Sequence, residues 1–360
     1  MMRETDILEA LRAGEVEFPP LEVRLVGVEP PFEASAQPWR PDAYVDIRWE
    51  DETFRFVAEV KAQSTPKAFR EAVQQVRFYA DASEMQPLIV TTYLAPERLE
   101  GLESSGVSGI DLSGNGVVVV AGKLLVVRTG NPNRFPAGRR IRNVYQGASS
   151  LVVRVFLNRP SYGSVQEVMD EVTDRGGRVS LSTVSKVLKV LEEDLVLRRE
   201  GRASHLLQAD ELLERLAANY KPPRISARKT YRWNGEREDL MDRLAACSQR
   251  LVLSGAGSVD AYTVMPREKA VQCYCTSIDP IEQRLGDKLE ESPLFPDLEL
   301  LETRDPTVYF DTRKAGEVPS ASPLQCWLEL QAGDKRQQDA SVAVRDRILN
   351  ELRSSGRTSS

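Results

Sequence analysis

The stretch from Pro41 to Tyr79 limits the possible folds most, because two runs within it alternate polar and apolar residues. The runs cover residues 44–49 and 54–61, and alternation with a period of two is typical of β-strands. The short segment between the runs predicts a hairpin with Asp51 and Glu52 as its turn. The chain therefore contains a strand pair with one polar face and one apolar face.

The register of this hairpin places Asp46 opposite Val57, so that Asp46, Glu59 and Lys61 share the polar face. Magnesium prefers carboxylate oxygens, and we expect Asp46 and Glu59 to be able to hold it. A metal held there would polarise a phosphodiester, while the Lys61 ammonium offsets the charge that develops on the phosphate. The opposite face is apolar, and we expect it to be buried: Val45, Ile47, Trp49, Phe54, Phe56, Ala58 and Val60.

The segment from Pro66 to about Ala82 predicts a helix on which Gln75 and Tyr79 share one face. The ordered set of an aspartate, a hairpin, Glu-x-Lys and Gln-x-x-x-Tyr resembles the PD-(D/E)xK nuclease superfamily, and the Gln75 motif resembles that of its RecB-like branch. The resemblance implies a restriction-endonuclease-like mixed sheet and a set of catalytic residues: Asp46 (with Asp42 as its rival), Glu59, Lys61 and Gln75. It implies magnesium only where the centre is active. The alternative is a charged outer strand face that is simply solvated.

The bulk composition narrows the class of protein. A chain of 360 residues exceeds one typical domain, and 41% apolar with 28% charged residues is ordinary for globular proteins. No apolar run approaches 18 residues and the N-terminal segment does not resemble a signal peptide, so we expect a cytoplasmic protein without a membrane span. His205 is the only histidine, which excludes serine-triad and histidine–metal chemistry. The net charge of −6 argues against a nonspecific nucleic-acid coat but leaves room for a local basic surface.

The first 130 residues predict one α/β domain. Strands and helices alternate after the hairpin, which is typical of a mixed sheet with flanking helices. Residues 131–147 then break the pattern with Gly, Pro and Asn and predict a linker. Four arginines make this linker basic: Arg134, Arg139, Arg140 and Arg142. The linker could contact phosphates, and a solvated tether is the equal competitor.

Residues 148–220 are predicted to be mainly helical. Helices are predicted over 149–157, 164–173 and 181–195, and a two-stranded hairpin over 197–207. Three helices followed by a hairpin resemble a winged helix-turn-helix. In such a unit the third helix enters the major groove of DNA and the wing reaches the phosphate backbone.

The third helix and the wing carry residues suited to DNA. Small hydroxyls allow close approach to base edges and phosphates, and lysine and arginine supply charge. The DNA-binding residues we expect are Ser180, Ser182, Thr183, Ser185, Lys186, Lys189, Arg198, Arg199 and Arg202. Winged helices also serve as protein–protein modules, which is the competing interpretation.

The remaining chain predicts a second basic linker over 221–233, an α/β domain over 234–353, and a disordered tail over 354–360. A strand that leads into Gly257-Ser258 resembles the opening of a nucleotidyltransferase. The strand over 270–275 lacks the paired aspartates that such an enzyme needs to hold magnesium triphosphate. We therefore expect a degenerate fold of this type.

The order of these parts resembles the AbiEi-type antitoxin and transcriptional-regulator family of type IV toxin–antitoxin systems. Four segments carry the resemblance: 111–115, 219–223, 322–328 and 333–336. It implies a repressor that binds double-stranded DNA and is paired in function, without stable contact, with a nucleotidyltransferase-type toxin. A homodimer would suit a palindromic operator, although no segment is a clear dimerisation element.

Two functions therefore stand after the sequence is read. The first is a DNA-binding transcriptional regulator with an inert or DNA-gripping nuclease-like domain. The second is a magnesium-dependent DNA endonuclease that the winged helix targets, since a repressor has no need of the Asp46, Glu59, Lys61 and Gln75 set.

Overall fold

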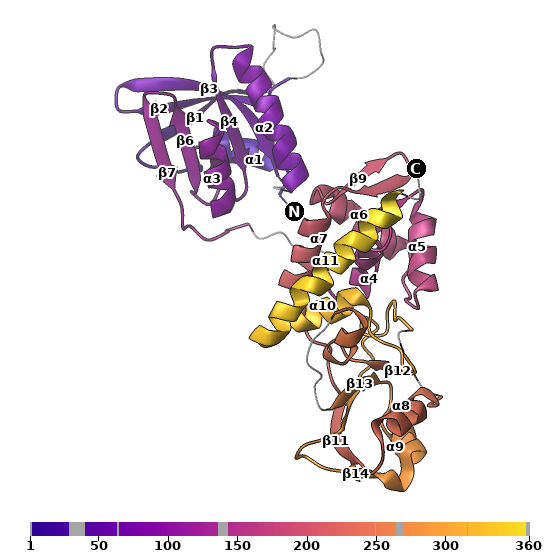
Figure 1. Ribbon diagram of the computed structural model, residues 1–360. Coiled ribbons are helices and arrows are strands. Elements are labelled where there is room, and N and C mark those ends of the chain that lie inside the picture. Colours follow the sequence, from indigo (N-terminus) through magenta and orange to yellow (C-terminus); the bar gives the residue numbers. More distant parts are fainter. Residues whose placement is uncertain are drawn as a thin grey trace. The chain divides into compact units, whose positions relative to one another are not determined.

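The protein is a mixed α/β chain with several sheets and two compact units (Figure 1). The computed structural model describes residues 2–28, 40–62, 65–135, 143–248, 250–263, 270–314 and 316–357. The units are Met1–Arg140 and Ile141–Ser360, so the division falls inside the first predicted linker. Of that linker's arginines, Arg134 is exposed, whereas residues 139, 140 and 142 lie outside the described part. No helix of the described ranges is both long and apolar enough to cross a membrane.

The first unit is built on a seven-stranded sheet with the order β1-β2-β3-β4-β5-β6-β7. The strands are β1 (Glu22–Val28), β2 (Ala43–Trp49), β3 (Glu52–Lys61), β4 (Gln86–Thr91), β5 (Ser108–Asp111), β6 (Gly116–Val120) and β7 (Leu124–Arg128). Strands β3, β4 and β5 run parallel, and the other neighbours pair antiparallel. This mixed sheet is the α/β architecture expected for the first 130 residues.

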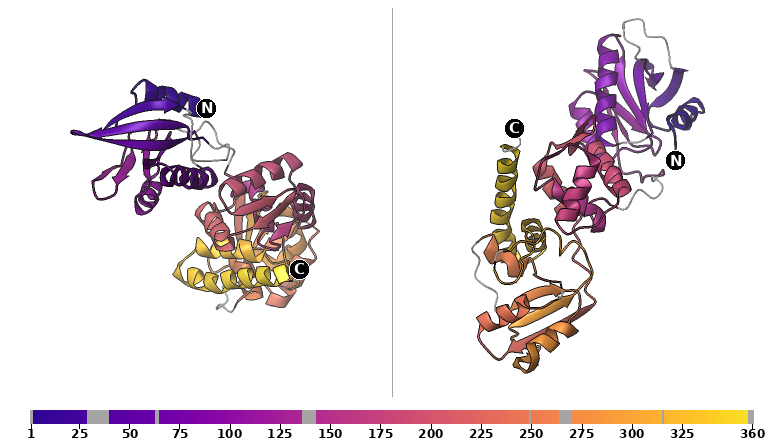
Figure 2. Two further views of the ribbon diagram at one scale, coloured as in Figure 1. Left: turned by 90° about the horizontal axis from the view of Figure 1, so that it is seen from above. Right: turned by 90° about the vertical axis from the view of Figure 1, so that its right-hand side faces the viewer.

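Helices cover both faces of this sheet. They are α1 (Glu4–Arg12), α2 (Pro66–Asp81) and α3 (Pro96–Ser104), with α1 on one side and the other two on the opposite side (Figure 2, left). The face under α1 is the one predicted to be buried: Val45, Ile47, Phe56, Ala58 and Val60 are buried there, and Trp49 and Phe54 partly so. The polar face is also covered, because Val57 and Ile89 pack under α2 and α3.

The hairpin register differs from the prediction by two residues. Trp49 pairs with Glu52, so the turn is Glu50-Asp51, and Glu50 adopts a left-handed φ of 55°. Asp46 consequently lies opposite Arg55 and not Val57. The Arg55 guanidinium donates to both Asp46 oxygens at 2.8 and 2.9 Å, and such a cross-strand charge pair favours this register.

The first part of the second unit contains four helices and a small sheet. The elements are α4 (Gly147–Val155), β8 (Ser161–Tyr162), α5 (Val165–Asp174), α6 (Leu181–Glu193), β9 (Leu197–Glu200), β10 (Ala203–Leu206) and α7 (Ala209–Ala218). Strand β10 lies between β8 and β9. Serine side chains begin α5 and α6, since Ser164 accepts from the Glu167 amide and Ser180 from the Thr183 amide.

The second part holds a five-stranded sheet with the order β12-β13-β15-β11-β14. Its strands are β11 (Ala227–Trp233), β12 (Leu251–Leu253), β13 (Val271–Cys275), β14 (Leu289–Glu291) and β15 (Leu298–Glu302). Its helices are α8 (Arg237–Ala245), η1 (Ala256–Ala261), α9 (Asp279–Leu285), η2 (Gly286–Lys288), α10 (Pro323–Gln331) and α11 (Lys335–Arg357).

Two predicted boundaries in this unit differ from the structure. Residues 227–233, predicted as the end of a basic linker, form β11, which pairs with both β15 and β14. Residues 354–357, predicted as disordered, continue α11. Helices α10 and α11 also share one core with α4 to α7, in which Val152, Leu188, Trp327 and Ile348 are buried. Residues 148–220, predicted to form the winged helix, and the C-terminal helices α10 and α11 therefore share one hydrophobic core.

Candidate functional site

Three charged side chains converge at the end of β3 in the first unit. Lys61 Nζ donates to Glu59 Oε2 at 2.8 Å and lies 3.8 Å from Asp42 Oδ2. The same Asp42 oxygen accepts a hydrogen bond from the Val60 amide at 2.7 Å, which anchors the carboxylate at this position. We call Asp42, Glu59 and Lys61 the acidic–lysine cluster.

The register shift decides which aspartate joins the acidic–lysine cluster. Asp46, the predicted metal ligand, pairs with Arg55, which lies two residues nearer the turn than the predicted partner Val57. Asp46 is therefore not part of the cluster. Asp42, its rival, lies just before β2, where its own amide donates to the Ala58 carbonyl. The predicted position of Asp46 opposite Val57 was wrong, because moving the turn by one residue moves the residue opposite each position by two.

Burial dominates the electrostatics of the cluster. Glu59 is only 3% exposed, and burial together with the Asp42 carboxylate raises its pKa to about 7 against the lowering effect of Lys61. Burial disfavours the Lys61 ammonium, yet the hydrogen bond and charge of Glu59, followed by the charge of Asp42, leave its pKa raised. The cluster thus holds a buried carboxyl that changes its protonation near neutral pH beside a lysine that stays charged.

Helix α2 lies over the same face of the sheet. Thr65 begins this helix by accepting from the Ala68 amide at 3.3 Å, and Pro66 occupies its first turn. Tyr79 is 1% exposed, and burial, then the charges of Glu59 and Asp42, raises its pKa to about 12. Gln75, one turn earlier on the same side of the helix, is half-buried. The structure therefore brings Tyr79 within electrostatic range of the cluster, with Gln75 beside it.

The donor set fits a hard divalent cation. Asp42 and Glu59 offer carboxylate oxygens near the Lys61 ammonium, and the charge of Asp42 raises the pKa of Glu59. Within the described ranges, no group of three or more His, Cys, Asp or Glu side chains gathers in a metal-binding arrangement. Two carboxylates suit magnesium, which keeps several waters and takes further oxygens from a phosphate substrate.

The carboxyl ends of three parallel strands meet at this edge of the sheet. Lys61 pairs with Thr91, and Thr91 pairs with Asp111. Thr91 Oγ1 donates to the Lys61 carbonyl at 2.8 Å and so links the ends of β3 and β4. Thr91 was not among the predicted residues, although its position at the end of a strand could have indicated it. Asp111 is buried and accepts from the amides of Leu94, Ser113 and Asn115, so it shapes a turn and is not a free ligand.

The predicted DNA-binding residues lie on α6 and on the hairpin of β9 and β10. Ser182, Ser185, Lys186 and Lys189 are exposed, whereas Ser180 and Thr183 form the cap that begins α6. Lys189 lies 3.8 Å from Glu193 at the far end of the helix.

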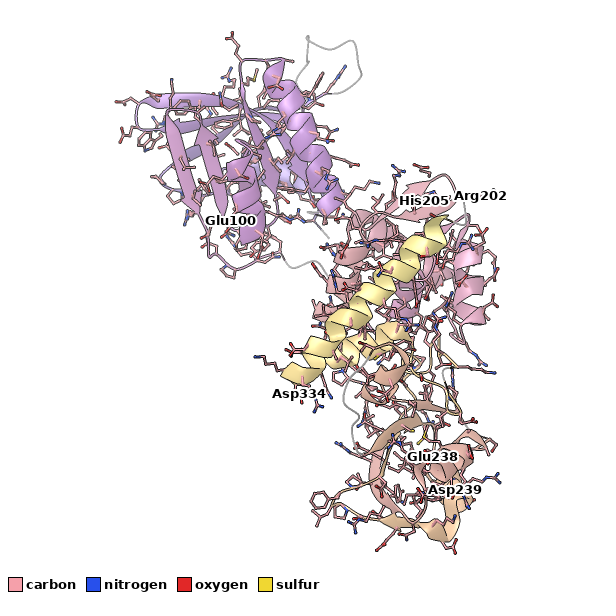
Figure 3. The ribbon with its side chains drawn as sticks, viewed as in Figure 1. Glu100, Arg202, His205, Glu238, Asp239 and Asp334 are labelled. Atoms are coloured by element: carbon pink, nitrogen blue, oxygen red, sulfur yellow. The ribbon has the colours of Figure 1, made fainter. Side chains whose placement is uncertain are left out.

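The hairpin presents its arginines differently from one another. Arg202 is exposed at the tip (Figure 3), Arg198 pairs with Glu200 at 2.9 Å, and Arg199 is half-buried. His205 Nδ1 lies 3.0 Å from Ser161 Oγ and ties β10 to β8.

Two further residues at the start of α6 lie beside the predicted DNA-binding residues of this helix and of the β9–β10 hairpin. We call all of these residues together the α6 surface. Arg178, in the turn between α5 and α6, is exposed, and Leu181 at the first position of α6 is 46% exposed. Their position at the start of the predicted third helix was the signal that could have identified them.

The Gly257-Ser258 turn of the second unit is closed by a side chain of its own. The Gly255 amide donates to Glu329 Oε2 at 2.7 Å, and the Gly257 amide donates to Ser254 Oγ at 3.1 Å. Glu329 also accepts from Gln325, and burial raises its pKa. A buried glutamate side chain thus occupies the inner side of this turn.

Comparisons with known proteins add no relative. No protein-family model matches the chain. No curated protein matches it, and no solved structure matches it. Inferences about function therefore rest on the geometry of the acidic–lysine cluster and of the α6 surface.

Proposed function

We propose that this chain is a magnesium-dependent DNA endonuclease of the PD-(D/E)xK type that a winged helix delivers to double-stranded DNA. The convergence of Asp42, Glu59 and Lys61 under α2 is the observation that carries this proposal. The element order α1-β1-β2-β3-α2-β4 around one mixed sheet supports it, as does Gln75 beside Tyr79 on the covering helix.

Each residue of the cluster has a chemical role in this proposal. Asp42 and Glu59 would hold magnesium, which supplies a polarised phosphodiester and a more acidic water when bound. The Lys61 ammonium would face the phosphate and offset the negative charge that builds up on it. Glu59 keeps Lys61 in place through the 2.8 Å hydrogen bond, and its ionised form is the one that binds a cation.

The α6 surface supports the DNA-binding half of the proposal. The order α4-β8-α5-α6-β9-β10 matches that of a winged helix, with α6 as the helix that enters the major groove. Lys186 and Arg202 would contact phosphates, and Leu181 and Ser182 would approach base edges. All four of these side chains are exposed.

A regulator without cleavage is the second candidate. In this case the chain is an AbiEi-type antitoxin and autorepressor, and the acidic–lysine cluster only grips DNA. The observation that favours it is the single core shared by the winged-helix segment with α10 and α11, together with the turn closed by Glu329. A toxin of the nucleotidyltransferase type would then act on the same pathway without stable contact.

A matched pair of aspartate variants tests the proposal. Magnesium and manganese are titrated into wild type, Asp42→Asn and Asp46→Asn by calorimetry, and each protein is incubated with supercoiled plasmid. We expect wild type and Asp46→Asn to bind metal and nick DNA, and Asp42→Asn to do neither. If none of the three proteins binds metal or nicks the plasmid, while all three still bind DNA, the regulator is favoured.

A further inference from the structure

Strand β7 forms one edge of the seven-stranded sheet in the first unit. It is a regular five-residue strand that pairs with β6 along its whole length. No strand of the described part of the chain pairs with its outer side. Such an edge presents a row of backbone N–H and C=O groups that can pair with another strand.

The first four side chains of β7 are apolar on both faces. Leu124 is buried and Val126 packs against the core under α1. Leu125 and Val127 point to the opposite face and are 56% and 48% exposed, because α3 contacts β5 and β6 and does not extend over β7. Two adjacent large apolar residues at an uncovered edge are typical of an interaction surface.

The other edge of the same sheet is built in a protected way. Strand β1 carries Glu22 and Arg24 and has an irregular register between Leu25 and Gly27. Charged side chains and bulges are devices that keep an edge strand from pairing with another chain. Strand β7 has a regular register and only one charged residue, Arg128 at its end, so the two edges of this sheet differ.

The chain that follows β7 turns away from the open edge. The Asn131 amide donates to Asn115 Oδ1 at 2.8 Å, and Asn131 Nδ2 donates to the Gly114 carbonyl at 2.8 Å. These bonds hold the segment against the turn between β5 and β6, which is on the inner side of β7. Residues 129–135 therefore leave the outer side of β7 accessible.

We propose that β7 pairs antiparallel with β7 of a second copy of this chain, with Val126 opposite Val126. In this register Leu125 lies opposite Val127 of the second copy, so the two exposed apolar residues cover each other. Lys123 lies opposite Thr129 and Arg128 opposite Leu124, so like charges never oppose each other across the pair. The strand is thus self-complementary under a two-fold axis, the commonest symmetry of protein dimers.

This inference does not depend on the proposed function. The acidic–lysine cluster lies on β3 and just before β2, which are four and five strands away from β7 in the sheet. A dimer of this kind would place one cluster in each copy. Failure of metal binding would leave the dimer standing, and loss of the dimer would leave metal binding measurable.

Sedimentation velocity of the full chain over a concentration series tests the pairing. We expect wild type to reach twice the monomer mass, and Val127→Lys to raise the dimer dissociation constant about tenfold or more by placing charge in the apolar contact. Val26→Lys, an equally exposed site on the β1 edge, is the matched control and should behave as wild type. Circular dichroism melting confirms that each variant is folded.

A cysteine at the two-fold position gives an independent measurement. Opposed residues in an antiparallel pair have Cα atoms about 4.5–5.5 Å apart, within the range that a disulfide spans. Val126→Cys should therefore form a cross-linked dimer on mild oxidation, and Val26→Cys should not. A monomeric wild type, or a dimer that Val127→Lys does not weaken, would overturn the proposal. A monomer whose β7 amides are protected from hydrogen exchange would show instead that this chain covers its own edge.

Discussion

Replacing Glu59 with glutamine should abolish a pH dependence of stability in the first unit. The carboxyl is 3% exposed, and burial followed by the charge of Asp42 raises its pKa to about 7 from the ordinary 4.5. Because the folded pKa is the higher one, the folded state binds more protons between these two values. The stabilising contribution is fully present below about pH 4.5 and is lost as the pH rises through about 7.

The magnitude follows from the difference between the two pKa values. At about 1.4 kcal/mol per pKa unit, wild type should lose about 3 kcal/mol of unfolding free energy between about pH 4.5 and pH 8. Glutamine keeps a carbonyl that accepts the Lys61 hydrogen bond but carries no charge to desolvate. Glu59→Gln should therefore lack this loss and should be the more stable protein at pH 8.

Hydrogen exchange of β3 peptides along a urea series measures this quantity for the first unit alone. Peptides from β13 report the second unit in the same experiment and should respond equally in both proteins. Glu52→Gln, a change of the same kind at an exposed side chain of β3, is the control and should retain the wild-type pH dependence. A wild-type β3 whose stability does not fall between pH 4.5 and pH 8, or a Glu59→Gln protein that keeps the fall, would refute the reasoning.

Three further measurements address the second unit. Lys186→Ala combined with Arg202→Ala should reduce the slope of log K against log salt by about 2, because each phosphate contact releases counterions; filter binding measures it, and a Lys221→Ala protein should keep the wild-type slope. Glu329→Ala leaves the Gly255 amide without its acceptor and should cost about 1–3 kcal/mol in urea unfolding, whereas an unchanged midpoint would contradict the buried bond. Leu188→Ala removes a fully buried side chain from the shared core and should cost about 2–5 kcal/mol; a smaller loss would mean that this core closes around the cavity.

Local sequence patterns predicted the elements of the site correctly where the physics is local. Alternation with a period of two identified β2 and β3 and the face that is buried under α1. The serine caps of α5 and α6 are equally local, because a capping side chain reaches only three residues along the chain. Glu59, Lys61 and Gln75 were predicted from spacing within these elements. The structure brings Glu59 and Lys61 together at the end of β3, and Gln75 lies half-buried on α2 one turn before Tyr79.

The choice of aspartate lay beyond such patterns. Turns at Glu50-Asp51 and at Asp51-Glu52 leave every side chain on the same face, since the opposed residue moves by two and the side-chain period is also two. The burial pattern is therefore identical in both registers. Only the cross-strand contact of Asp46 with Arg55, together with Asp42 beside the Val60 amide, distinguishes them.

The sequence by itself determined the strands, the helices, their caps and the residue types available for chemistry, because these depend on neighbours a few positions apart. Tertiary structure decided which of them meet. Residues 227–233 resemble a basic linker in isolation and become an inner strand only by pairing with residues 298–302, about seventy positions later. Likewise the pKa of Glu59 is set by burial under α2 and by an aspartate seventeen positions earlier. Pairing and burial join distant parts of the chain, and no local pattern records them.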